Sequence, residues 1–84
     1  MTHFTTPEFW RHFGRLPEEI QRLAEKYFEL LKQNSWHPSL RLNKAGKFWT
    51  VRVAIHYRAV AKERAEGLNW FWIGHHSEYD RLLS

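Results

Sequence analysis

Side chains with the chemistry to act on a phosphate are concentrated in the second half of this 84-residue chain. They are Arg52, His56, Arg58, His75, His76 and Tyr79. Guanidinium groups match the planar oxygens of a phosphate, whereas imidazole and phenol groups accept and donate protons. Such a set can cleave RNA without a metal: a base removes the 2′-hydroxyl proton, an acid protonates the leaving 5′-oxygen, and cations stabilise the phosphate. Each residue alone also fits a plain surface or hydrogen-bonding role, so both interpretations stay open.

The same residues do not predict a metal site. Consecutive residues in an extended segment point in opposite directions, so His75 and His76 form a poor chelating pair, and no third ligand follows at metal-binding spacing. The chain contains no cysteine, which excludes thiolate ligands and disulfide bonds. We therefore expect no metal, no cofactor and a reducing compartment.

Positive charge is concentrated in the middle of the sequence. Residues 41–64 contain seven lysines and arginines and one acid, whereas residues 1–40 contain five charges of each sign and residues 65–84 sum to −2. This asymmetry favours nucleic acid or another acidic partner, and a solvated basic face explains it equally well. The further candidates for RNA binding are Arg41, Lys44, Lys47 and His56.

The basic segment has the alternation of a half-buried sheet. From residue 49 to residue 61 the odd positions are all apolar, while the even positions include Thr50, Arg52, His56 and Arg58. One face is therefore expected to join the core and the other to carry cations and a histidine. Residues 41–46 predict a short edge strand and a turn before it.

Two helices are expected before the sheet. Thr6 can cap a short helix that begins at Pro7, and a longer amphipathic helix begins at Pro17 and ends at Asn34. The connection around Pro38 should be extended, because a residue that precedes proline is biased away from the helical region.

The C-terminal part predicts a central strand and a final helical turn. Leu68–Ile73 is an almost continuous apolar run, which indicates a strand covered on both faces, with the helices packed on one side of the sheet. Fourteen aromatic residues can supply the core of a single domain over residues 1–84. No apolar run reaches membrane-spanning length and the N-terminus lacks a signal-peptide pattern, so we expect a cytoplasmic protein.

Several of these motifs occur together in a characteristic order. They are Val51–Val53, Tyr57–Ala59 and Ile73–His75, followed by Tyr79. In this order, and over nearly the whole chain, the sequence resembles the RelE/ParE superfamily of bacterial type II toxins. The resemblance implies an α+β fold, in which an N-terminal helical hairpin packs on a small, mainly antiparallel sheet of three or four strands, with a short C-terminal helical turn.

The resemblance also predicts a hairpin inside the long alternating segment. Its thirteen residues exceed the usual strand length of about 3–10. Similar toxins turn just before the Tyr-Arg pair, which places the turn near residues 54–56. These residues include no Gly, Asn or Asp, unlike preferred hairpin turns. The turn decides whether Arg52 or His56 shares a face with Arg58.

The ribosome-dependent ribonucleases of this superfamily imply roles for individual residues. The resemblance assigns transition-state stabilisation to Arg58 and a basic strand position to Arg52. It assigns a position just past the last strand to His76 or His75, and a tail tyrosine to Tyr79. The implied function is a toxin that cleaves mRNA in the ribosomal A site without a metal, with the ribosome, mRNA and a cognate antitoxin as partners.

Two other functions remain open on the sequence. Thr50 stands where the best-known ribonuclease members carry a lysine, so the cationic cluster of this chain contains fewer positive charges than theirs. ParE-like inhibitors of DNA gyrase share the scaffold and the pair Tyr57–Arg58 without the full catalytic set. A basic binding module without toxic activity is the third interpretation.

Overall fold

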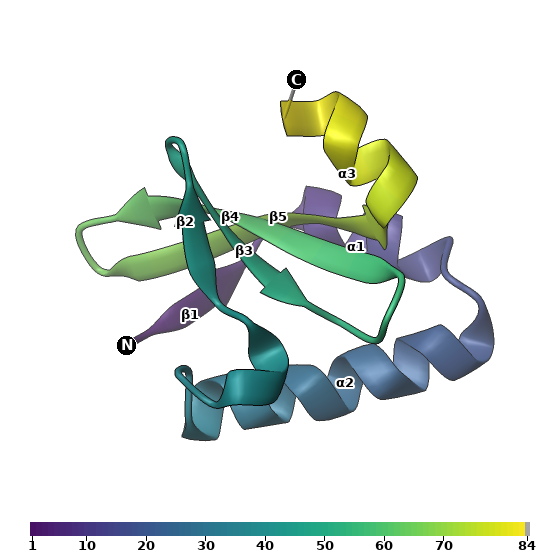
Figure 1. Cartoon of the computed structure of the whole chain (residues 1–84), viewed down its shortest axis with the longest axis horizontal. Helices are drawn as coiled ribbons and strands as arrows, with labels where there is room; N and C mark the ends of the chain where they lie inside the picture. Colours follow the sequence, from purple (N-terminus) through teal and green to yellow (C-terminus); the bar gives the residue numbers. More distant parts are fainter. Residues whose placement is uncertain (84) are drawn as a thin grey trace.

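The computed structural model describes residues 1–83, and within them strands and helices form the expected α+β fold (Figure 1). The elements are β1 (His3–Thr5), α1 (Pro7–Gly14), α2 (Glu18–Gln33), the 3₁₀ turn η1 (Pro38–Leu40), β2 (Asn43–Ala45), β3 (Phe48–Arg52), β4 (Tyr57–Arg64), β5 (Gly67–His75) and α3 (His76–Leu83). No helix among the described residues combines the length and the apolar composition needed to cross a membrane.

The strands form one sheet in the order β1-β5-β4-β3-β2. β1 pairs with β5 in parallel, and the other neighbours are antiparallel. β1 is one strand more than the three or four expected, and its three residues are too short to show an alternating pattern. The Thr2 carbonyl accepts a 2.9 Å hydrogen bond from the Leu68 N–H, and a Cβ on Gly67 would collide with that carbonyl. Gly67 therefore allows β1 to approach β5.

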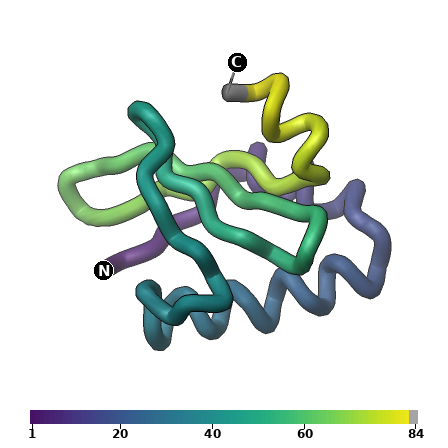
Figure 2. The backbone as a smooth tube through the Cα atoms, viewed as in Figure 1, coloured from purple at the N-terminus to yellow at the C-terminus, as the bar shows by residue number. Residues whose placement is uncertain are grey.

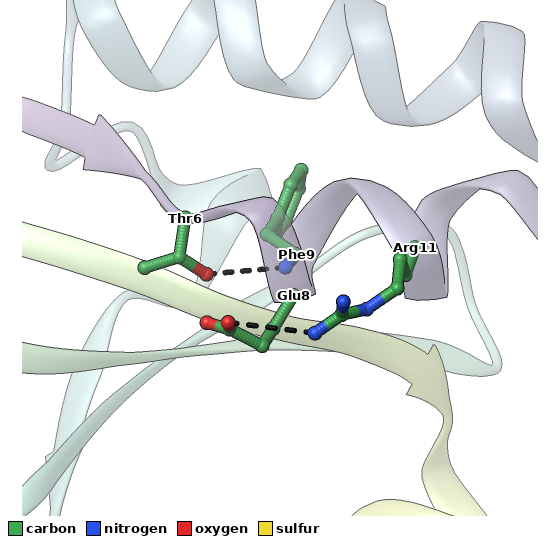
Figure 3. A network of polar contacts seen from close by, with 4 residues as sticks. All are labelled: Thr6, Glu8, Phe9 and Arg11. Atoms are coloured by element: carbon green, nitrogen blue, oxygen red, sulfur yellow. Dashed lines mark hydrogen bonds and ion pairs between the residues drawn. The ribbon is translucent and has the colours of Figure 1, made fainter.

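The N-terminus of α1 is capped as the sequence predicted (Figure 3). The Thr6 hydroxyl accepts a 3.1 Å hydrogen bond from the backbone N–H of Phe9. The Arg11 guanidinium lies 3.4 Å from the Glu8 carboxylate, one turn earlier on the exposed side. The cap fixes where α1 begins, and the buried Phe9 ring packs against Phe28 of α2.

The core lies between the sheet and the helices α1 and α2. Phe28 of α2 stands between Phe9 and Trp70, with ring centroids 5.2 Å and 6.2 Å away and edge-to-face geometry. Phe9 and Trp70 are fully buried. Edge-to-face aromatic packing of this kind concentrates burial in few residues, which a short chain requires.

The connection after α2 differs from the extended segment that was expected. His37 itself is extended, as a residue before proline should be, but the three residues after it close the turn η1. The His37 Nδ1 atom accepts a 3.2 Å hydrogen bond from the Ser39 N–H. A local side-chain cap of this kind is not visible in an apolar pattern.

The expected hairpin is confirmed between β3 and β4. The Val53 N–H donates a 3.0 Å hydrogen bond to the Tyr57 carbonyl, and Ala54 takes a left-handed conformation with φ of 65°. Arg52 lies directly opposite Arg58 in the register, whereas His56 belongs to the turn. The residue that shares a face with Arg58 is therefore Arg52.

The sheet has a second face, turned away from α1 and α2, which we call the outer face. It carries alternate residues of β3 and β4, which are Phe48, Thr50, Arg52, Arg58, Val60 and Lys62. Val60 and its register partner Trp72 are buried, but they lie outside the core cluster. α3 lies on the opposite side of the sheet from α2 (Figure 2).

A chain of hydrogen bonds through His3 ties the N-terminal strand to the core. The buried Trp70 Nε1–H donates to His3 Nδ1 at 3.0 Å, and His3 Nε2 lies 2.9 Å from the Ser35 hydroxyl. Ser35 in turn donates to the Leu31 carbonyl at 2.7 Å. Because Nδ1 is an acceptor, the network holds His3 in the neutral form with its proton on Nε2. Burial, and secondly the N-terminal ammonium, lower the pKa of His3 from 6.5.

We expect the free energy of unfolding to decrease as the pH falls below 6.5, the pKa of an unperturbed histidine. Over that range the unfolded chain binds a proton at His3 that the folded chain does not, and His12, whose pKa burial also lowers, acts in the same direction. Denaturant titrations at about pH 7.5 and about pH 5.5 measure this dependence.

The variant His3→Ala separates the network from other titrations. It should cost about 1–3 kcal/mol at neutral pH, because the Trp70 N–H loses its acceptor, and it should weaken the pH dependence. An identical pH dependence in wild type and variant would contradict this assignment.

Candidate functional site

Two arginines lie side by side on the outer face near the β3–β4 turn. Arg52 and Arg58 are cross-strand partners, and both are half-buried. The Arg58 Nη1 atom donates a 3.1 Å hydrogen bond to the Tyr57 carbonyl, and neither arginine forms an ion pair with any residue in the described range 1–83. Like charges directly opposite each other destabilise a sheet. An anion bound between them would remove that repulsion.

Three imidazole rings gather at the end of the sheet where β4 begins and β5 ends. The His75 and His76 ring centroids are 4.5 Å apart, and the His56 ring lies 6.0 Å from the first and 5.9 Å from the second. The His76 N–H also donates a 2.8 Å hydrogen bond to the His56 carbonyl. Gly74 pairs with Arg58, whereas His75 pairs with Tyr57, which packs against the core. By the alternation of the strand, His75 therefore lies on the helix-facing side and the two arginines lie on the outer face, at the same end of the sheet.

The expectation that His75 and His76 point in opposite directions is wrong. That rule holds for an extended segment, but β5 ends at His75 and α3 begins at His76, so the backbone turns between them and the rings stack. The groups His, Cys, Asp and Glu of residues 1–83 nevertheless offer no set of three or more that is arranged to hold a metal ion.

Hydrogen bonding fixes which nitrogen of His75 is available for chemistry. Its Nδ1 atom accepts a 3.2 Å hydrogen bond from the Ser77 N–H and lies 3.0 Å from the Ser77 hydroxyl, which caps the start of α3. The neutral ring therefore carries its proton on Nε2. The Tyr57 ring packs against His75 edge to face, at 5.4 Å between centroids. His75 is thus positioned rigidly, whereas His56 and His76 are exposed.

Tyr79 lies three residues after His76 on α3, on the same side of the helix, and is half-buried. A small cavity of about 190 Å³ opens beside the cluster and is lined by residues that include His12, Tyr57, His75 and Glu78. Burial, followed by the nearby Arg15, lowers the pKa of His12. His12 was not predicted as a site residue, because its helix α1 lies far from the sheet in the sequence.

Gly74, the register partner of Arg58, has no room for a side chain. A Cβ on Gly74 would lie 2.7 Å from the Trp72 ring, closer than real side chains approach. Any larger residue would displace this buried ring or β5 next to Arg58.

The predicted RNA-binding residues do not all join this site. His56 belongs to the imidazole cluster, whereas Lys44 pairs with Trp49 on the helix-facing side and lies 3.8 Å from the Glu63 carboxylate. Arg41 precedes β2 in a left-handed conformation and is exposed. Lys47 lies in the β2–β3 turn, at the opposite end of β3 from Arg52.

Comparison with known proteins extends this description. No protein-family model matches the sequence, and no curated protein matches it significantly. The fold is similar to that of a chain in the crystal structure of the RelB–RelE antitoxin–toxin complex from Methanococcus jannaschii. The TM-score is 0.69 at 16% identity, over 96% of this chain and 99% of that one.

A second similar structure is the toxin–antitoxin complex RelBE2 from Mycobacterium tuberculosis. Here the TM-score is 0.66 at 16% identity, over 88% of this chain and 95% of that one. Both matches span nearly the full length of the molecules compared. The α+β architecture of this chain is therefore the RelE-like fold, and the resemblance to the RelE/ParE superfamily noted in its sequence is confirmed at the level of the fold.

Proposed function

We propose that this protein is the toxin of a type II toxin–antitoxin system and a metal-independent endoribonuclease that cleaves mRNA on the ribosome in the cytoplasm. The observation that carries the proposal is that the Arg52–Arg58 pair and a cluster of three imidazole rings lie at the same end of the sheet. Two guanidinium groups suit a phosphate, and histidines beside it suit proton transfer. The similarity of this fold to a chain in each of two toxin–antitoxin complexes supports the toxin role.

We assign phosphate binding and proton transfer in the cleavage step to different side chains of the site. Arg58 and Arg52 hold the scissile phosphate and neutralise the charge that it gains when the 2′-oxygen attacks. One group of the set His75, His76 and Tyr79 accepts the 2′-hydroxyl proton, and another protonates the leaving 5′-oxygen. The neutral His75 ring can donate a hydrogen bond from Nε2 to a phosphate oxygen, because its Nδ1 is engaged by Ser77, and it acts as the acid only in its imidazolium form. His76 and Tyr79, on one side of α3, are the candidate bases.

A cognate antitoxin is the proposed partner that keeps this surface inactive. The outer face and the β2–β3 turn carry Arg52, Arg58, Lys62 and Lys47, none of which forms an ion pair within residues 1–83. Such a surface suits an acidic or amphipathic segment lying across the sheet or along the helical hairpin. In the two complexes with the same fold, the toxin was crystallised together with an antitoxin. Co-expression with the cognate antitoxin, which the resemblance implies is encoded beside the toxin, should restore growth and yield a co-purifying pair.

Inhibition of DNA gyrase is the second candidate, and Thr50 favours it. Thr50 lies on the outer face between Phe48 and Arg52, but it is only 5% exposed and its hydroxyl donates a 2.9 Å hydrogen bond to Asn43. The position therefore adds no cation to the site. A ribonuclease must work here with two arginines alone, whereas a gyrase inhibitor needs no phosphate-binding cluster.

Pulse labelling after induced expression distinguishes the two. For the ribonuclease we expect incorporation of labelled methionine to stop before incorporation of labelled thymidine, and Arg58→Ala to prevent both effects. Early arrest of thymidine incorporation together with inhibited gyrase supercoiling would contradict the proposal. Normal growth at full expression would indicate the non-toxic binding module instead.

A further inference from the structure

Two phenylalanines lie together on the outer face, at the opposite end of the strands from the arginines. The Phe48 and Phe71 ring centroids are 5.7 Å apart, with 53° between the ring planes. The Lys62 ammonium lies 5.5 Å from the Phe71 centroid, and the Lys47 ammonium lies 5.6 Å from the Phe48 centroid. We call these four residues the aromatic–lysine patch.

Folding alone does not account for the patch. Both rings are half-buried and lie outside the core cluster. Phe71 is the extra residue of a β-bulge: Val60 pairs with Trp72 and Ala61 pairs with Trp70, which leaves Phe71 without a partner on β4. Bulges redirect side chains and are enriched near functional sites. Here the bulge directs an aromatic ring to the outer face, where it meets a ring from β3.

The aromatic–lysine patch lies on the same face of the sheet as the Arg52–Arg58 pair. Lys62 follows Arg58 by four residues on the same face of β4, which corresponds to roughly 13 Å along the strand. Phe48 precedes Arg52 by the same number of residues on β3. A single strand of nucleic acid bound at the arginine pair can therefore reach the patch.

The chemistry of the patch suits single-stranded RNA. Exposed aromatic faces stack on bases of any sequence, and lysines beside them contact phosphates. An acidic peptide would satisfy the lysines but make no specific use of the two ring faces. We propose that the aromatic–lysine patch is a base-stacking subsite that holds the mRNA strand beside the nucleotide being cleaved. This inference rests on the ribonuclease function proposed above.

The test measures binding by fluorescence anisotropy with two labelled probes. One is a single-stranded RNA methylated at every 2′-oxygen, which cannot be cleaved by 2′-hydroxyl attack, and the other is the same strand with abasic positions. Wild type should bind the strand with bases more tightly. Phe71→Leu should lose about 10-fold in affinity for that strand, in the range of one stacked base, and little for the abasic strand. Phe48→Leu provides a second, independent variant.

Matched controls distinguish the loss of base stacking from the loss of charge and from a disturbed fold. Trp36→Leu changes an aromatic that is 62% exposed and contacts Trp49 on the helix-facing side, so it should leave both affinities unchanged. Lys62→Ala should keep the preference for bases but reduce the slope of log K against log salt by about 0.7. Lys26→Ala, on the exposed side of α2, should leave that slope unchanged.

Two outcomes overturn the inference. One is that folded Phe48→Leu and Phe71→Leu bind both RNA strands as wild type does, or lose affinity for both equally. The other is that they keep RNA affinity and lose binding of a polyglutamate peptide, which would assign the patch to a protein partner. Because the RNA probe is not cleaved, a protein that shows the stacking preference but does not cut translated mRNA refutes the proposed function and not the subsite.

Discussion

Replacing Arg58 with alanine is expected to reduce mRNA cleavage by about 10²–10³-fold, as loss of one transition-state contact does in other enzymes. Arg58 lies opposite Arg52 on one side and Gly74 on the other, so it is the central cation at this end of the outer face. The fold should survive, because the side chain is outside the core cluster. Removal of one member of a like-charged cross-strand pair should even raise stability slightly.

Two further variants make this prediction specific. Arg58→Lys keeps the charge but loses the planar guanidinium group that can bind a phosphate through two hydrogen bonds. Its activity should therefore fall between those of wild type and Arg58→Ala. Arg22→Ala removes an exposed arginine of α2 that pairs with Glu18, and it should cleave as wild type does. Single-turnover cleavage rates with ribosome-bound mRNA provide the measurement. Equal activity of Arg58→Ala and Arg22→Ala would contradict the assigned role.

Removing a proton-transfer group should have the second large effect, about 10²–10⁴-fold on the cleavage rate. We expect this loss for His76→Ala, since its exposed ring stacks on His75 at the end of the sheet that carries the arginine pair. The pH dependence of the rate should also change shape, which a purely structural defect does not cause.

His75 requires a variant that preserves its structural contact. His75→Asn retains an acceptor for the Ser77 N–H, so α3 should still begin at the same residue while proton transfer is lost. His37→Asn is the matched control, because the His37 ring caps η1 through Ser39 in the same way, far from the site. A His75→Asn protein that is as active as His37→Asn would show that His75 only caps the helix.

The sequence predicted the elements that depend on local chemistry. Thr6 and Pro7 start α1 through a side-chain cap, and α2 follows from its apolar stripe. The β3–β4 hairpin was predicted from the resemblance, since its left-handed residue is Ala54 and offers no conventional turn signal. Elements of this kind are determined by neighbours along the chain.

Features that depend on distant contacts were not predictable in the same way. β1 needs the Gly67 backbone for its approach, and a three-residue strand carries no periodic pattern. The stacking of His56 on His75 and His76 depends on where β5 ends, because one more extended residue would send the two rings to opposite sides.

The candidate site was predicted in part. Arg52, Arg58, His75, His76 and Tyr79 were named from their chemistry. The structure places the two arginines as cross-strand partners and stacks the two histidines at the same end of the sheet. Of the aromatic–lysine patch, only Lys47 was named from the sequence. The pair of phenylalanine rings was missed, because a β-bulge interrupts the alternation of β5 and no pattern of polarity reveals it.

The most direct test of the ribonuclease function is to map mRNA 5′ ends in a defined translating system. Purified wild-type protein and Arg58→Ala are added in parallel, with and without ribosomes, and the ends are located by primer extension. We predict new ends at codons in the ribosomal A site that require both ribosomes and Arg58. Intact mRNA in the presence of folded wild-type protein would contradict the ribonuclease function and leave gyrase as the target to examine.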